Sequence, residues 1–359
     1  MTPLTLFDLF NRQQWREAIF KSGRWHFPGF RKYRTPGKLA GLTEVFRQAG
    51  SGPWHATDPL GEIVRNSGLA TEIVFCTFDY DRQRARFIRS NSGSLAAGTQ
   101  ASQTAGMSLV EAVHASSTAP VRFFDAPAVL QQGGRSVRFW DGAVGGYNNP
   151  VMAGVVEAIA NHPERQSRIR ALSLGTGSVS LPMRETAAQT GGLYKPRPSP
   201  GLLTDIGLLA AAIVDDPPDA ASFMAHVMLG GRLPQPGDSV SDGPVVRLSP
   251  LIQPLNPSGR DDGWQYPKGL EREFDRLTTL ELDAVQQADV DAIKKLTALW
   301  LQGQVSNQAI RANGNSLHCE IGHADYPTAV KAWQTLDNTG GYPHPDNTRI
   351  LLERLAGSF

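Results

Sequence analysis

The chain has 359 residues, with 35 Lys and Arg against 34 Asp and Glu, so its formal net charge is +1. This balance argues against nucleic acid or an anionic membrane surface as an electrostatic partner. Hydrophobic residues make up 40% of the sequence, which supports a packed core and argues against wholesale disorder. The two cysteines, Cys76 and Cys319, form no disulfide framework and favour a reducing, cytoplasmic location.

No segment of the sequence predicts export or membrane insertion. The first residues carry an early acid and no basic region before an apolar core, so we expect no secretory signal. The most apolar segment, 202–214, is short and contains Asp205, so we expect a core helix and no transmembrane span. A helix lying on a membrane surface is the alternative, which keeps peripheral membrane contact open.

Hydrophobic periodicity and turn residues predict an alternation of helices and strands. In chain order we expect helices over 4–20 and 38–48, a strand over 71–78 with a hairpin partner over 84–90, a helix over 108–117, a strand over 136–140, a helix over 150–161 and a strand over 168–174. A helix over 202–214, a strand over 244–248 and a largely helical region beyond 259, with a last helix over 348–355, follow. The alternation from 71 to 174 predicts an α/β fold whose strands are at least partly parallel.

An acidic residue stands at the end of the predicted strand over 136–140. Asp141 is followed by Gly142 and Ala143, and Asn148-Asn149-Pro150 comes shortly after. In α/β sheets, ligands bind at the carboxyl ends of strands, and glycine lets the backbone turn tightly and approach a neighbour. A plain Asp-Gly turn is the structural alternative.

The order of four motifs resembles the patatin-like phospholipase family of lipid acyl hydrolases. These motifs are the ASSTAP helix end at 115–120, the DGA at 141–143, the NNP at 148–150 and the LSLGTG at 172–177. The resemblance is good for residues 38–180 and faint beyond 200. It implies a patatin-like layered sheet flanked by helices over residues 1–255, followed by a helical region over 256–359.

The resemblance also implies a mechanism that needs no metal and no cofactor. In this family a Ser–Asp dyad without histidine hydrolyses an acyl ester, and Asp141 matches the catalytic aspartate that takes and returns the proton. The implied partner is a lipid or acyl-ester substrate, and the implied role is lipid degradation. Burial beside Phe139 and Trp140 would raise the pKa of the Asp141 carboxyl.

Two further family motifs are absent from the sequence. The chain contains no Gly-x-Ser-x-Gly nucleophile elbow and no glycine-rich oxyanion loop, and the imitations at 50–52 and 92–94 lie in loop-like segments. We therefore expect a patatin-like fold that lacks its N-terminal part and is inactive as it stands. The alternative is a catalytically inactive remnant, or a scaffold or binding protein of the same fold.

The other candidate residues favour structural interpretations. We expect Cys76 to be buried, Ser116 and Ser117 to pack and cap a helix end, and His114 to pair with Glu111 at the surface. Gly175-Thr176-Gly177 predicts a tight turn rather than a phosphate site. The spacing of His318, Cys319, Glu320, His323 and Asp325 matches no standard zinc pattern, so we expect no metal site there.

Overall fold

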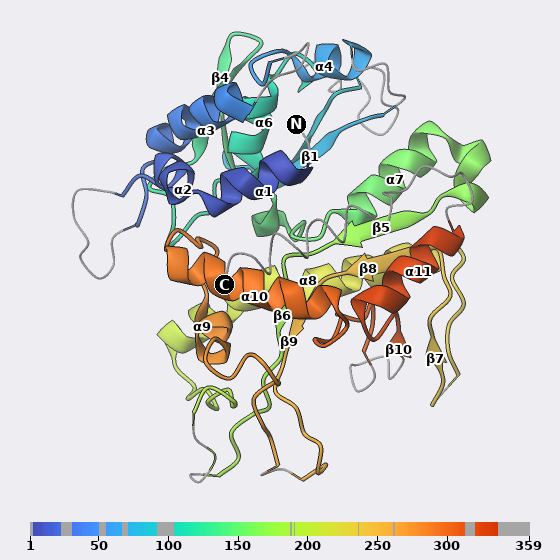
Figure 1. Ribbon diagram of the computed structural model, residues 1–359. Coiled ribbons are helices and arrows are strands. Elements are labelled where there is room, and N and C mark those ends of the chain that lie inside the picture. The colour runs from blue at the N-terminus through green and yellow to red at the C-terminus, as the bar shows by residue number, and fades with distance from the viewer. Residues whose placement is uncertain are drawn as a thin grey trace. The chain divides into compact units, whose positions relative to one another are not determined.

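The computed structural model of this chain shows a mixed α/β protein (Figure 1). It describes residues 3–22, 31–49, 55–66, 71–91, 104–186, 189, 191–235, 237–260, 263–312 and 320–336. The chain divides into two compact units: unit 1 comprises Met1–Gln166 with Ala211–Pro218, and unit 2 comprises Ser167–Ala210 with Asp219–Phe359. The limit of the patatin-like region at residue 255 is not tested by this division and stays a prediction.

Unit 1 contains a four-stranded antiparallel sheet. Its strands are β1 (Val74–Asp79), β2 (Arg84–Arg89), β3 (Ala128–Gln132) and β4 (Arg135–Asp141), in the order β2-β1-β4-β3. Gly133 and Gly134 join β3 to β4, and both have positive φ angles, of 56° and 75°. Such two-residue turns match the twist of antiparallel strands.

The strands predicted over 71–78, 84–90 and 136–140 correspond to β1, β2 and β4. Strand β3 was not predicted, although the Gly-Gly pair before Arg135 is a hairpin signal. Parallel pairing does not occur in this sheet, because β1–β2 and β3–β4 are tight hairpins. Within the predicted α/β stretch, β5 (Ala171–Leu174) pairs in parallel with β8 (Val245–Leu248), and Phe124 forms an isolated parallel bridge with Tyr33.

The described helices of unit 1 are α1 (Pro3–Asn11), α2 (Gln13–Ile19), α3 (Thr35–Ala49), α4 (Leu60–Asn66), α6 (Leu109–Ser116), α7 (Val151–Asn161) and the 3-10 helix η2 (Gly142–Gly145). The 3-10 helix η3 (Pro163–Arg168) spans the end of this unit at Gln166. Helices were predicted in unit 1 over 4–20, 38–48, 108–117 and 150–161; the first is divided into two helices, and α4 was not predicted. A capping box begins α6: the Ser108 hydroxyl accepts from the Glu111 N–H, and the Glu111 carboxylate accepts from the Ser108 N–H. This reciprocal arrangement satisfies two backbone donors at the helix start.

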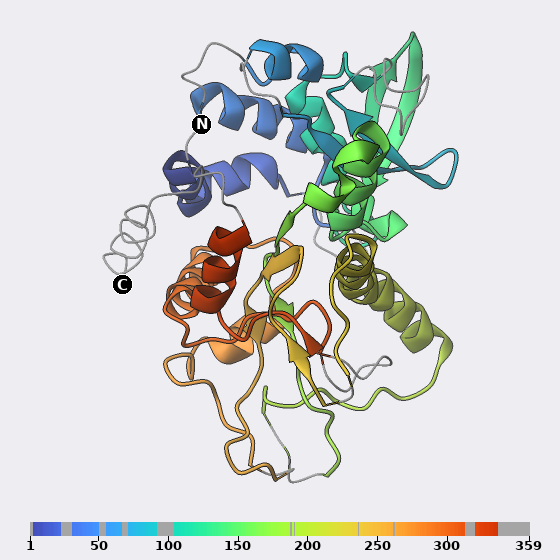
Figure 2. The ribbon, with the colours of Figure 1, turned by 90° about the vertical axis from the view of Figure 1, so that its right-hand side faces the viewer.

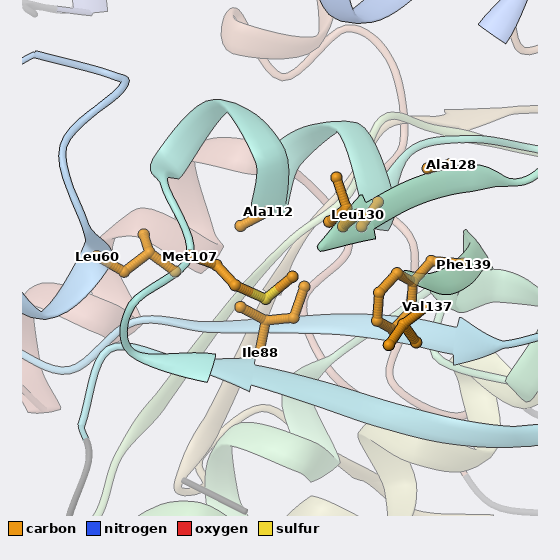
Figure 3. Close-up of a cluster of buried hydrophobic side chains, with 9 residues drawn as sticks. Leu60, Ile88, Met107, Ala112, Ala128, Leu130, Val137 and Phe139 are labelled. Carbon is orange, nitrogen blue, oxygen red and sulfur yellow. The ribbon is translucent and has the colours of Figure 1, made fainter. Parts of the chain in front are cut away.

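The core of unit 1 lies between α6 and the sheet (Figure 3). The cluster consists of apolar side chains that are at most 8% exposed: Leu60, Ile88, Met107, Ala112, Ala115, Ala128, Leu130, Val137 and Phe139. Strand alternation explains the contribution of β3, in which Leu130 is 3% exposed while its neighbour Val129 is 52% exposed.

Unit 2 is built from short parallel strand pairs and helices. Its elements are β5, β6 (Ser178–Val179), β7 (Ser239–Val240), β8, β9 (Leu251–Ile252), α9 (Phe274–Thr279), α10 (Gln287–Leu301), β10 (Glu320–Ile321) and α11 (Tyr326–Leu336). In parallel, β5 pairs with β8, β6 with β9, and β7 with β10. Figure 2 shows α10 and α11, in orange and red, beside β8, and α11 packs on Val246 and Leu248 of that strand.

The helix predicted over 202–214 is longer than expected. Helix α8 runs from Leu202 to Met228 and continues past Pro217 and Pro218. A proline removes one backbone hydrogen bond and can kink a helix without ending it. The predicted end of this helix at residue 214 was therefore wrong.

The C-terminal region contains α9, α10 and α11, as the expected helical character requires, together with the short strand β10. The last predicted helix, over 348–355, lies outside the described residues. In the part of the chain that the structure describes, no helix is both long enough and apolar enough to cross a bilayer.

Adjacent residues of β3 provide a test of the core. We expect Leu130→Ala to lower the free energy of unfolding by about 2–5 kcal/mol, because it leaves a cavity between β3 and α6. Val129→Ala removes an exposed side chain and should change the same quantity by less than about 1 kcal/mol. Urea denaturation followed by circular dichroism measures both, and equal losses for the two variants would contradict the packing.

Candidate active site

Asp141 is the last residue of β4, where the strand turns into η2. Its Cα lies opposite Thr77 of β1. Its backbone N–H donates to the Thr118 carbonyl at 2.8 Å, and its carboxylate Oδ1 accepts from the Ala143 N–H at 2.8 Å. Asp141 therefore caps the turn that follows it, as the turn interpretation of Asp-Gly predicted. Both its backbone and one carboxylate oxygen are held by main-chain groups.

Gly142 allows the turn to press against β1. A Cβ atom at Gly142 would lie 2.5 Å from the Cys76 carbonyl oxygen and 2.9 Å from the Cys76 Cβ. These distances are shorter than real Cβ contacts, and the closest of these atoms belong to the Cys76 carbonyl group, so only glycine fits between η2 and β1 without a backbone shift. The close approach predicted for this glycine is confirmed.

The Asp141 carboxyl lines a small cavity of about 340 Å³. Its walls also include Val74, Phe75, Cys76, Ser116, Gly142, Tyr147, Asn148 and Pro150. A larger cavity of about 1140 Å³ shares the residues Val74, Cys76 and Pro150 with it. The lining of this larger cavity includes the small residues Ala153, Gly154 and Ala158 of α7. Space for a ligand of substantial size thus adjoins the carboxyl.

A lysine from a distant part of the sequence is buried near this carboxyl. Lys38 of α3 is only 2% exposed. Its Nζ donates to the His114 carbonyl at 3.2 Å, to the Ser117 hydroxyl at 2.8 Å and to the Thr118 hydroxyl at 3.0 Å. It also lies 4.7 Å from the centre of the Phe124 ring. The three hydrogen bonds use every donor of the ammonium group.

Burial shifts the pKa values of these two groups toward each other. It raises the pKa of the Asp141 carboxyl, while the Ala143 N–H bond and the charge of Lys38 act in the opposite direction. Burial lowers the pKa of Lys38 to about 7, against the raising influence of the Asp141 charge. A carboxyl with a raised pKa is a better proton acceptor and donor near neutral pH than an exposed one.

The neighbouring Cys76 and His114 do not compete for this chemistry. Burial raises the pKa of the Cys76 thiol to about 12, so the thiol stays protonated, as the predicted buried cysteine requires. Burial and the charge of Lys38 lower the pKa of His114 to about 3, so this imidazole is neutral at pH 7.

The predicted surface pair between His114 and Glu111 is wrong. His114 is 3% exposed, and the Glu111 carboxylate serves the capping box with Ser108. His114 is buried because α6 packs against α3 and against the sheet. The predicted capping role of Ser117 is confirmed by its hydroxyl, which donates to the Val113 carbonyl at 2.6 Å.

Ser116 lines the cavity of Asp141 without contacting its carboxyl. Its hydroxyl donates to the Cys76 carbonyl at 2.8 Å. This bond ties the end of α6 to β1, which agrees with the predicted packing role. Ser116 and Asp141 are thus neighbours in the cavity wall, and no hydrogen bond between them is present.

The remaining candidates lie in unit 2. Gly175 faces Arg247 of the neighbouring strand β8, and Ser249 just after it, so closely that a Cβ atom would lie 2.4 Å from the Arg247 guanidinium. Gly177 has a φ of 112°. These glycines form a turn after β5, as predicted. His318 and Cys319 lie outside the described residues, and within those described no cluster of three or more metal-ligating side chains occurs.

Lys38 was not predicted as a site residue, although its position in the helix pattern is a signal for burial. Leu42 and Val45 follow it at helical spacings of four and seven, and both are buried. A lysine in line with an apolar helix face is a candidate for a buried, functional cation.

No family model and no curated protein matches the sequence.

Two glycines near the cavity provide a matched test of the site's geometry. Gly142→Ala should destabilise the protein and displace η2, because the new methyl group meets the Cys76 carbonyl. Gly154→Ala, in α7, has no atom within 4 Å of its new Cβ and should raise the free energy of unfolding by about 0.5–1 kcal/mol. Thermal unfolding of both variants measures these changes in stability. A Gly142→Ala variant as stable as the wild type would contradict the close approach of Gly142 to Cys76.

The raised pKa of Asp141 makes a prediction about stability against pH. The folded protein binds the carboxyl proton of Asp141 more tightly than the unfolded chain does, so this group stabilises the folded state at low pH. The contribution to the free energy of unfolding is lost as the pH rises through the folded-state pKa. Asp141→Asn lacks this titration. Denaturation of both proteins between pH 4 and 6 should show the wild type falling relative to the variant, and parallel curves would exclude a raised pKa.

Proposed function

We propose that Asp141 is the proton-transferring residue of a serine-dependent lipid acyl hydrolase that resembles the patatin-like phospholipases. In this reaction a serine hydroxyl attacks the acyl carbon of an ester while Asp141 accepts the hydroxyl proton. Asp141 then returns the proton to the departing alcohol, which leaves an acyl-serine. Water attacks this intermediate with its proton again passing to Asp141, and the serine is regenerated as the acid departs.

The observation that carries this proposal is the position of the Asp141 carboxyl. It lies in the wall of a cavity, its Oδ1 is anchored by the Ala143 N–H, and its pKa is raised. Among the described residues, no other hydrogen bond to this carboxylate occurs, so Oδ2 can accept a proton from a reactant in the cavity. The adjoining space of about 1140 Å³ offers room for an acyl group.

The proposal assigns the nucleophilic serine to a polypeptide that these 359 residues do not include. The sequence holds no Gly-x-Ser-x-Gly motif, and the hydroxyl of Ser116 is engaged by the Cys76 carbonyl. The 359 residues alone are therefore proposed to be inactive. A lipid substrate reached by peripheral membrane contact, and a cytoplasmic location, belong to the same proposal.

The Ser116 hydrogen bond also favours a second candidate, a catalytically inactive binding protein of the same fold. A fluorophosphonate probe separates the two. The protein isolated from its own source should be labelled on a serine if the hydrolase proposal is right. An unlabelled protein of about 38.9 kDa with no esterase activity would support the binding protein instead.

The direct test is the variant Asp141→Asn in the protein isolated from its source, with an acyl ester of p-nitrophenol as substrate. We expect hydrolysis to fall by at least 100-fold, because general-base catalysis by one residue contributes about 10²–10⁴-fold. Asp81→Asn is the control, since its carboxylate pairs with Arg138 at the surface. Full activity in Asp141→Asn would exclude the role of Asp141.

A further inference from the structure

Lys38 and Asp141 both bond to residues at the C-terminal end of α6, and the charge of each influences the pKa of the other. Lys38 comes from α3, and Asp141 comes from the end of β4. His114 of α6, Cys76 of β1 and Tyr147 in the cavity wall are titratable groups beside them. The raised pKa of the thiol and the lowered pKa of the imidazole keep Cys76 and His114 neutral at pH 7. Arg89 of β2 acts on Cys76, but its guanidinium is paired with Glu157 at 2.9 Å.

The contacts of Lys38 lead directly to the backbone of Asp141. Its Nζ donates to the Thr118 hydroxyl, and this hydroxyl also donates to the His114 carbonyl. The Thr118 carbonyl in turn accepts from the Asp141 N–H at 2.8 Å. The ammonium group thus orders the turn that holds the end of β4, from a position where a cation is favoured by the C-terminal carbonyls of α6.

We propose that Lys38 is a positioning residue for Asp141, which orders the Ser117–Thr118 turn against the end of β4 and supplies the positive charge that faces the carboxyl. This role rests on the proposed function of Asp141. Lys38 does not line either cavity, so it acts through the turn and through its charge rather than by contact with a substrate.

The charge has a consequence for the protonation of Asp141. An opposite charge nearby favours the ionised carboxylate, and burial opposes it. Because the pKa of Lys38 is about 7, its charge is lost as the pH rises through that value. The titrations of the two groups are therefore coupled, and the environment of the carboxylate changes when the lysine loses its proton.

The test follows the carboxyl carbon of Asp141 by NMR in the 359-residue chain labelled with ¹³C at the aspartate carboxyl carbons. Asp141→Asn identifies the signal. In the wild type we expect a main transition from the carboxyl and a second, smaller inflection near pH 7 from Lys38. In Lys38→Arg, which keeps its charge over this range, the main transition should stay and the inflection near pH 7 should vanish.

Lys38→Met should raise the midpoint of Asp141 by on the order of one pH unit, because the compensating charge is gone. It should also speed hydrogen exchange of the Asp141 N–H. Lys21→Met, which removes an exposed lysine before α3, is the control and should change neither. A solely structural role for Lys38 would leave the carboxyl titration unchanged.

Two results would overturn the proposal: a midpoint in folded Lys38→Met equal to that of the wild type, or an inflection near pH 7 that persists in Lys38→Arg. If Lys38→Met does not fold, the comparison of wild type with Lys38→Arg decides alone. Since these signals need no nucleophile or substrate, loss of the coupling and loss of the proposed hydrolysis are separate outcomes.

Discussion

The close approach of Gly142 to the Cys76 carbonyl is the constraint on which the candidate site depends. A side chain at position 142 would push η2 away from β1, since its Cβ would lie 2.5 Å from that oxygen. With glycine there, the turn closes, the Ala143 N–H reaches the Asp141 carboxylate, and the carboxyl comes to line a cavity. The hydrogen bonds that Asp141 itself makes among the described residues are thus to main-chain groups, the Ala143 N–H and the Thr118 carbonyl.

Helix α6 connects this site to the core of unit 1. One part of its surface, with Ala112 and Ala115, packs into the apolar cluster on the sheet (Figure 3). Its C-terminal turn provides Ser116, which bonds to β1, and Thr118 beyond it, which bonds to the end of β4. Small residues at the helix end let the helix lie close to the strands. The packing that stabilises the unit therefore also fixes the geometry around Asp141.

Buried charge sets the chemistry of the site. An ammonium group without hydrogen-bond partners in a protein interior would be strongly destabilising. Lys38 retains three hydrogen bonds and a position over the Phe124 ring, and these offset part of the loss of hydration. The remainder lowers its pKa to about 7. Burial also raises the pKa of Asp141, so the pKa values of the acid and the base are shifted toward each other.

The sequence by itself determined the local features: the hairpin of β1 and β2, the amphipathic α6 and α7, the glycine-backed acid at the end of β4 and the turn after β5. These depend on residue spacing and turn chemistry, which operate over a few residues. The tertiary structure alone decided the antiparallel order of the sheet, the continuation of α8 past two prolines and the burial of His114. It alone brought Lys38 to Thr118, which is 80 residues away in the chain and bonds to the backbone of Asp141. Such arrangements depend on how whole helices and strands pack, and no local pattern specifies which distant side chain comes to lie near this acid.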